Sequence, residues 1–351
     1  MGRSAHTSDS RTQAGRAVAL ALAGSWRSPP PPLVLGRDLT QTELAIAAPL
    51  AIHGGAGALV SRRLLAASAE GPVARELRQL HRRQALEEAM QREWLVRLSG
   101  ALADARVPFT LIKGFTIAAR YPEAGLRPFC DLDVVVAPSD VAAVRQIKLA
   151  LPQLELDVHT MVPHLAPAWA AEALARATEE RFAGSVVRVL RHEDALALLA
   201  LHALAHGVWR PVWLCDLAVF VEGAARTLDW DRVLGGPMRQ SQGVATALLL
   251  AREALGARLD GTPLAERRTP SWLLPALHAQ WGATYEVQAP QVGMPRTPAA
   301  LMEVARRRFR DPITATAAVG PWNELPRWPF QMIDLAQRSA RFVRRQLRRP
   351  S

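Results

Sequence analysis

The sequence has few cysteines and lysines, and it has no long uninterrupted apolar run. Two cysteines, Cys130 and Cys215, are too few for a disulfide framework or a cysteine-only metal cage, and they favour a reducing compartment. No apolar stretch reaches the roughly 18 residues that a membrane span requires. The short apolar segment at 17–23 is not typical of a secretory signal, because Arg27 and a run of prolines follow it without a convincing cleavage site. We therefore expect a cytoplasmic protein without a membrane span.

Lysine is almost absent, although the chain is strongly basic. Lys113 and Lys148 are the only lysines, so arginine supplies nearly all of the 43 basic side chains, against 32 acidic ones and a net charge of +11. A coding bias towards arginine is the simplest cause of this skew. The positive balance favours anionic partners such as nucleotides, nucleic acid or acidic lipid. Nucleic acid is not expected, because no recognition motif and no interleaving of aromatic with basic residues accompanies the charge.

The distribution of apolar residues divides the chain into helical and mixed regions. With 351 residues, 49% of them apolar, the chain is long enough for a sizeable core in one large or two ordinary domains. We predict an α+β fold that is mostly helical, with a small mixed-sheet α/β core between N-terminal and C-terminal helical regions. The predicted parts are a disordered N-terminus (1–15), an N-terminal helical region (16–106), the α/β core (107–190) and a C-terminal helical region (191–351) that ends in a basic helix.

The boundary of the α/β core follows from a change of period. A long helix is predicted over 73–105 from apolar residues at steps of three and four, and Asp38 is a predicted N-cap of an earlier helix. At Val107 this pattern stops. Short apolar or alternating segments follow, each typical of a strand. They cover 109–112, 131–136, 154–160 and 185–190.

Two carboxylates on the second predicted strand are the first sign of chemistry. Asp131 and Asp133 are two residues apart and therefore share one face of the strand. Like charges at that distance repel unless a cation lies between them, and Mg²⁺ prefers such oxygen ligands. On the next strand Asp157 shares a face with Glu155 and His159, which makes Asp157 the natural third acid. The plainer interpretation is a pair of solvent-facing acids on an edge strand.

The residues that end the first predicted strand fit a phosphate. Gly114 lets phosphate oxygens approach the backbone, and the helix that follows offers free N–H groups. Lys113 adds a point charge suited to phosphate. The tract from Lys113 to Val136 is therefore the most informative part of the sequence.

At this point the sequence resembles a known family, the nucleotidyltransferases encoded in bacterial natural-product (including lasso-peptide) and polysaccharide gene clusters, within the DNA polymerase beta-like superfamily. The residues that carry the resemblance are Leu111-x-Lys113-Gly114, Tyr121, Arg127, Asp131-Leu-Asp-Val-Val-Val, Leu156-Asp-Val-His159, Val189-Leu-Arg-His-Glu-Asp194, His202, His206, Leu214-Cys-Asp216 and Leu228-Asp-Trp230. The resemblance covers roughly residues 38 to 255.

The resemblance implies a site and an activity. Gly114 would open the phosphate-binding turn, with Thr116 as the only nearby hydroxyl because Phe115 replaces the usual serine. Asp131, Asp133 and Asp157 would hold Mg²⁺, two ions being expected, and Asp157 would help to deprotonate an acceptor. Lys113 and Arg127 would neutralise phosphate. The chain would then transfer a nucleoside monophosphate from an NTP to a small-molecule or peptide acceptor.

Further residues and an alternative function remain open. His202 and His206 lie four residues apart and so share a helix face, but Ala203 replaces the glutamate of the zinc metalloprotease signature. They are either hydrogen-bonded packing residues or, with His159 and Asp216, residues that line the cleft near the nucleotide or acceptor. The alternative to an enzyme is a catalytically weakened nucleotide-binding or scaffold protein of the same fold, which Phe115 and the short connection before Asp157 favour.

Overall fold

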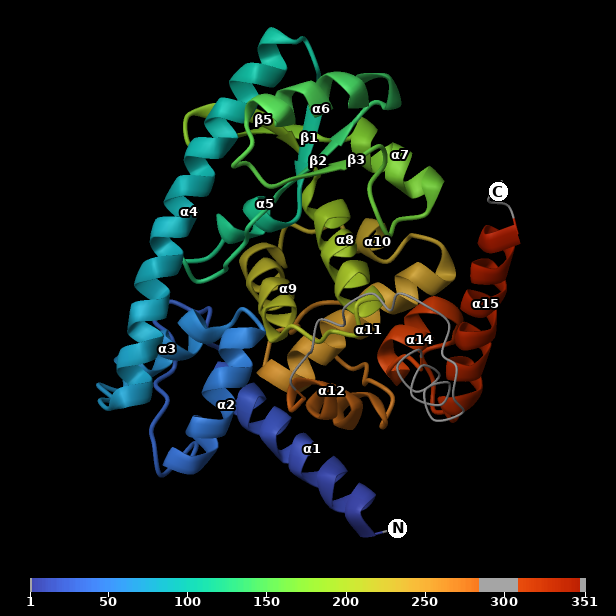
Figure 1. Ribbon diagram of the computed structural model, residues 1–351. Coiled ribbons are helices and arrows are strands. Elements are labelled where there is room, and N and C mark those ends of the chain that lie inside the picture. The colour runs from blue at the N-terminus through green and yellow to red at the C-terminus, as the bar shows by residue number, and fades with distance from the viewer. Residues whose placement is uncertain (1, 284–308, 348–351) are drawn as a thin grey trace.

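A computed structural model describes residues 2–283 and 309–347 and shows a mostly helical chain built around one mixed sheet (Figure 1). The sheet lies at one end of the molecule, and the long helix α4 (Pro72–Asp104) runs along the side from the N-terminal helices to the sheet. The α+β architecture, with a small mixed sheet between two helical regions, is confirmed.

The sheet has five strands in the order β3-β2-β1-β5-β4. Strand β1 pairs antiparallel with β2 and parallel with β5, β2 pairs parallel with β3, and β4 pairs antiparallel with β5. Four of the strands match predicted segments, whereas β4 has a charged, weakly alternating sequence that the sequence analysis did not select. The strands are β1 (Phe109–Ile112), β2 (Leu132–Val136), β3 (Leu156–His159), β4 (Thr178–Phe182) and β5 (Ser185–Val189).

The two faces of the sheet belong to different hydrophobic cores, because side chains alternate along each strand. In β2, Leu132, Val134 and Val136 pack into the core that contains the C-terminal half of α4 and Val144 of α6 (Val141–Ala150). Val135 instead joins the larger core formed by the helical regions. Asp133 shares the face of Val135, so its carboxylate is directed towards the helical regions.

Helix α1 (Gly2–Leu22) extends into the segment 1–15, for which the sequence analysis predicts disorder. It packs along α12 (Leu273–Trp281), and two glycines allow the close approach. A Cβ on Gly15 would lie 1.8 Å from the His278 carbonyl oxygen, and one on Gly282 would lie 1.8 Å from that of Arg11. The polar composition of the segment suggested disorder, but its structure depends on a helix more than 250 residues away in the sequence.

The start of helix α2 (Gln41–His53) also differs from the prediction. Thr40, not Asp38, is the N-cap: the Glu43 amide donates to Thr40 Oγ1, and Thr40 N donates to the Glu43 carboxylate. This is a capping box, which satisfies two free amides reciprocally. Asp38 instead accepts from the Val34 amide at 2.9 Å and pairs with Arg37. Helix α3 (Gly57–Ala66) then leads to α4.

The remaining helices cover the sheet and form the C-terminal region. Helices α5 (Gly114–Ala118), α6 and α7 (Pro167–Ala175) connect strands. The C-terminal elements are α8 (His192–Ala205), α9 (Pro211–Ala224), α10 (Trp230–Val233), α11 (Met238–Leu255), α12, α14 (Pro312–Val319) and α15 (Trp328–Leu347). Over residues 2–283 and 309–347, no helix has the length and apolar character needed to cross a membrane.

Candidate active site

The predicted site residues converge where three neighbouring strands lie side by side. Asp133 of β2 is opposite Ile112 of β1, and Lys113 follows Ile112 directly. On the other side Asp133 is opposite Asp157 of β3, because β2 and β3 are parallel and in register. The side chains of these two aspartates therefore project from the same face of the sheet.

Asp133 is the centre of this group. Its Oδ1 accepts a hydrogen bond from Lys113 Nζ at 2.7 Å and lies 3.1 Å from His159 Nε2. Burial by itself would raise the pKa of Asp133, but the hydrogen bond to His159 and the charge of Lys113 outweigh it and lower the pKa. The carboxylate is thus held in its charged form by two partners from adjacent strands.

His159 connects the two aspartates. Its Nε2 lies 3.2 Å from Asp157 Oδ2, and one donor atom from each of Asp133, Asp157 and His159 lies within 4.8 Å of the others. Asp131 precedes β2 and is half-buried. Burial, followed by the negative charge of Asp133, raises the pKa of Asp131. The site therefore concentrates more negative charge than its own cations neutralise, which favours a bound cation.

The turn between β1 and α5 has an unusual backbone. Lys113 has φ of +55°, a conformation that is uncommon for a residue with a Cβ and that recurs at functional sites. Gly114 lies against Arg127 and Phe129, where a Cβ would be 3.1 Å from Arg127 Nη1. Phe115 packs edge-on against Phe129 and Phe182 in the core. The residue that replaces the family's usual serine is thus a packing residue.

Thr116 and Arg127 have partners within the protein. Thr116 Oγ1 donates to the Lys113 carbonyl at 2.8 Å and lines a separate small cavity, not the one that contains Asp133. Arg127 donates through Nε and Nη2 to Asp216 Oδ2 at 3.3 and 3.2 Å, and Tyr121 donates to Asp216 Oδ1 at 2.8 Å. Burial raises the pKa of Asp216, which Arg127 and Tyr121 only partly offset.

One cavity of about 560 Å³ brings most of these residues together. Its wall includes the predicted residues Lys113, Gly114, Arg127, Asp131, Asp133, Asp157, His159, His202, His206 and Asp216. The cavity is large enough for a nucleotide-sized ligand. It lies between the sheet and helices α8 and α9. The sequence analysis assigned the sheet to the α/β core and these two helices to the C-terminal helical region.

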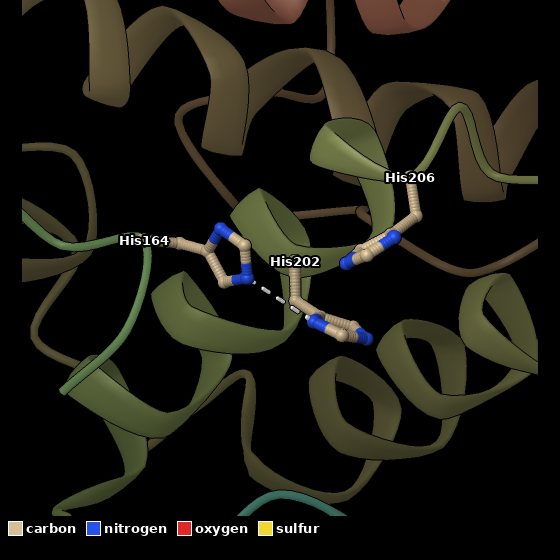
Figure 2. A group of neighbouring side chains, drawn as sticks. All are labelled: His164, His202 and His206. Atoms are coloured by element: carbon tan, nitrogen blue, oxygen red, sulfur yellow. Dashed lines mark hydrogen bonds between the residues drawn. The ribbon is translucent and has the colours of Figure 1, made fainter. Parts of the chain in front are cut away.

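Among the cavity-wall residues that the sequence analysis did not select, His164, Arg210 and Trp213 have side chains suited to binding a ligand. Arg210 lies 5.7 Å from the ring centre of Trp209 and 5.8 Å from that of Trp213, and burial lowers its pKa. Within the described ranges its Nε is buried without a hydrogen-bond partner, and no salt bridge to Arg210 is found there. His164 lies beside His202 and His206 (Figure 2). The signal available in the sequence for His164 was its position five residues after His159, in the segment that follows β3.

Similarity to known proteins is found at the level of the family. A family model described as "uncharacterised nucleotidyltransferase" matches residues 41–151 and 150–256. No curated protein matches the chain significantly. Among solved structures, an antigenic nucleotidyltransferase-like protein from Paracoccidioides brasiliensis is similar at 16% identity and a TM-score of 0.32, over 46% of this chain and 89% of that one.

Proposed function

Because the chain belongs to the family of uncharacterised nucleotidyltransferases, we propose that it transfers a nucleoside monophosphate from an NTP to a small-molecule or peptide acceptor in a Mg²⁺-dependent reaction. Natural-product or polysaccharide biosynthesis is the proposed setting. The observation that carries the proposal is the meeting of Asp131, Asp133 and Asp157 beside the Lys113-Gly114 turn in one nucleotide-sized cavity.

The donor set fits Mg²⁺. Three carboxylates supply hard oxygen ligands, and the pKa of Asp131 is raised by burial and by Asp133, so a cation would relieve an existing repulsion. Asp131, Asp133 and Asp157 would hold the ions, with His159 Nε2 hydrogen-bonded to Asp133 and 3.2 Å from Asp157 Oδ2. When bound, Mg²⁺ supplies charge neutralisation for the triphosphate and for the attacking and leaving oxygens.

The protein's own residues would orient the reactants and move one proton. The acceptor oxygen forms a bond to the α-phosphorus, the bond to the bridging oxygen breaks, and pyrophosphate leaves. Asp157, whose side chain is 54% exposed, receives the acceptor's hydroxyl proton, and His159 orients that carboxylate. Lys113 and Arg210 would neutralise phosphate charge. Arg127 is less available for this role because Asp216 already neutralises it.

One observation favours the second candidate, a scaffold that binds nucleotide without turnover. Asp133 Oδ1 is already engaged by both Lys113 and His159. If Lys113 and His159 keep these contacts when a nucleotide binds, they would exclude the metal ion needed for transfer.

Calorimetry and product analysis separate the two functions. We expect ATP, GTP, CTP or UTP to bind only with Mg²⁺, and Asp131→Asn and Asp133→Asn to weaken that binding by more than about tenfold, which is about 1.4 kcal/mol. Glu179→Gln on exposed β4, outside the cavity, is the matched control. Metal-independent binding that is unchanged in both variants would contradict the site.

Asp157→Asn tests turnover. We expect it to keep NTP binding but to abolish pyrophosphate release with a panel of hydroxyl-bearing sugars and peptides. NTP binding without pyrophosphate release by the wild-type protein across the whole panel would favour the scaffold.

A further inference from the structure

Three histidines form a second cluster in the wall of the same cavity, separate from the aspartates. One nitrogen from each of His164, His202 and His206 lies within 4.8 Å of the others. His164 Nε2 and His202 Nδ1 are 3.3 Å apart, and the three rings converge on one space (Figure 2). The cluster joins two segments that are 38 residues apart in the sequence.

The backbone holds these side chains in place from two directions. His202 lies in the last turn of α8 and His206 caps it, so the two rings are one turn apart, with centres 4.6 Å from each other. His164 lies between β3 and α7 with φ of +65°. Gln240 of α11 donates to the His164 carbonyl at 2.6 Å and accepts from the Ala166 amide at 2.9 Å. This pair of hydrogen bonds fixes the loop that presents His164.

The surroundings keep the imidazoles neutral, which is the form that binds metals. Burial, reinforced by neighbouring histidines, lowers the pKa of His164 to about 4 and that of His202 to about 2. Burial also lowers the pKa of His206. Lys113, Arg310, Asp133 and His159 are the groups outside the cluster that act on these pKa values, and Lys113 is paired with Asp133.

Packing alone does not account for the arrangement. Trp213 covers one side, with its ring centre 5.1 Å from that of His202 and 5.7 Å from that of His206. The other side is open to the cavity. In the part of the chain that the structure describes, the contact between His164 and His202 is the only hydrogen bond found for these three rings. Nitrogen lone pairs are therefore left for a ligand.

We propose that His164, His202 and His206 bind one transition-metal ion of the Zn²⁺ class, with an exchangeable fourth position open to the cavity. Three imidazoles and one open position are a ligand set that zinc commonly takes, whereas Mg²⁺ prefers the oxygens of the aspartate cluster. The fourth ligand would be water or an anionic oxygen of a molecule in the cavity. The cavity would thus hold two metal sites of different chemistry, and the zinc site does not depend on the proposed transfer reaction.

Metal titration of the full chain, made without a histidine tag and stripped with EDTA, tests the site. We expect one equivalent of Zn²⁺ to bind at a micromolar or lower Kd, and Co²⁺ to give the intense visible bands of a tetrahedral site. His164→Ala and His202→Ala should each weaken Zn²⁺ binding by at least about tenfold, which is about 1.4 kcal/mol. Circular dichroism would show whether both variants fold. If His202→Ala does not fold, the result for His164→Ala decides the outcome.

Two controls locate the ion. His192→Ala removes a histidine at the other end of α8, outside the cavity, and Asp133→Asn removes the centre of the aspartate cluster. Both should keep the zinc affinity and the Co²⁺ spectrum. The proposal is overturned by zinc binding that survives His164→Ala unchanged, by its loss in Asp133→Asn, or by the absence of a stoichiometric Zn²⁺ complex.

Discussion

Lys113 Nζ lies 2.7 Å from Asp133 Oδ1, so the lysine that follows β1 holds the central carboxylate of β2. Both side chains are largely buried, and the pair joins two antiparallel strands. A metal ion at Asp133 would take over the same electrostatic role. The contribution of Lys113 to stability should therefore depend on whether a metal ion is bound at Asp133.

Lys113→Met should destabilise the protein more without Mg²⁺ than with Mg²⁺ alone, because the metal ion can replace the lysine charge beside Asp133. Loss of a hydrogen bond to a charged group is expected to cost about 1.5–3 kcal/mol, because Asp133 keeps only His159 as a partner. Urea unfolding with and without Mg²⁺, in the absence of nucleotide, measures the difference. Lys148→Met, which removes the other lysine and its bond to the Leu156 carbonyl, is the control and should show no such dependence. If the loss of stability is equal in both conditions, Lys113 and the metal ion do not occupy the same position beside Asp133.

Asp216→Ala should destabilise the fold strongly. Asp216 is 1% exposed, and its removal leaves the Arg127 guanidinium buried without its counter-ion. Breaking such a pair costs about 3–5 kcal/mol. Tyr121→Phe removes one hydrogen bond to the same carboxylate and should cost only about 1 kcal/mol. Denaturant unfolding of both variants compares the two losses of stability. A similar small loss in each would show that Arg127 finds another partner.

Stability of the metal-free protein should fall as the pH is lowered from 6.5 towards 4. Burial lowers the folded-state pKa of His164 to about 4 and that of His202 to about 2, so the unfolded chain binds more protons in this range. Stability is therefore fully present above the unfolded pKa near 6.5 and is lost below it. The slope of the free energy of unfolding against pH that His202 contributes has an upper limit of about 1.4 kcal/mol per pH unit.

Unfolding in EDTA at several pH values measures this dependence. His202→Gln should make the slope between pH 6.5 and pH 5 shallower than in the wild type. An unchanged slope would mean that His202 contributes no linked protonation.

Gly15→Ala should weaken the contact between α1 and α12. The new Cβ would lie 1.8 Å from the His278 carbonyl oxygen, and backbone cannot move as freely as a side chain. We expect a loss of about 1–3 kcal/mol. Gly100→Ala, within α4, meets nothing within 4 Å and should raise stability by up to about 1 kcal/mol. Thermal unfolding of the two variants provides the comparison, and a neutral Gly15→Ala would contradict the close packing of α1.

The elements that have strong local signals were predictable. Periodicity selected α4, and apolar or alternating runs selected β1, β2, β3 and β5. Strand β4 was missed because its charged residues lie on an edge strand, where pairing with β5 compensates for weak alternation. Polar composition predicts disorder over residues 1–15, and the packing of α1 on α12 at Gly15 is a contact that this composition does not signal.

The sequence by itself determined which residue types stand at the end of β1 and on β2 and β3, since strand periodicity dictates that residues two apart share a face. The sequence therefore predicted that Lys113, Asp133 and Asp157 belong to one site. Only the tertiary structure decided their partners. Asp216 neutralises Arg127 from 89 residues away, and His164 joins His202 across a loop and a helix. Such pairings depend on how helices α8 and α9 pack onto the sheet, and no local pattern encodes that packing.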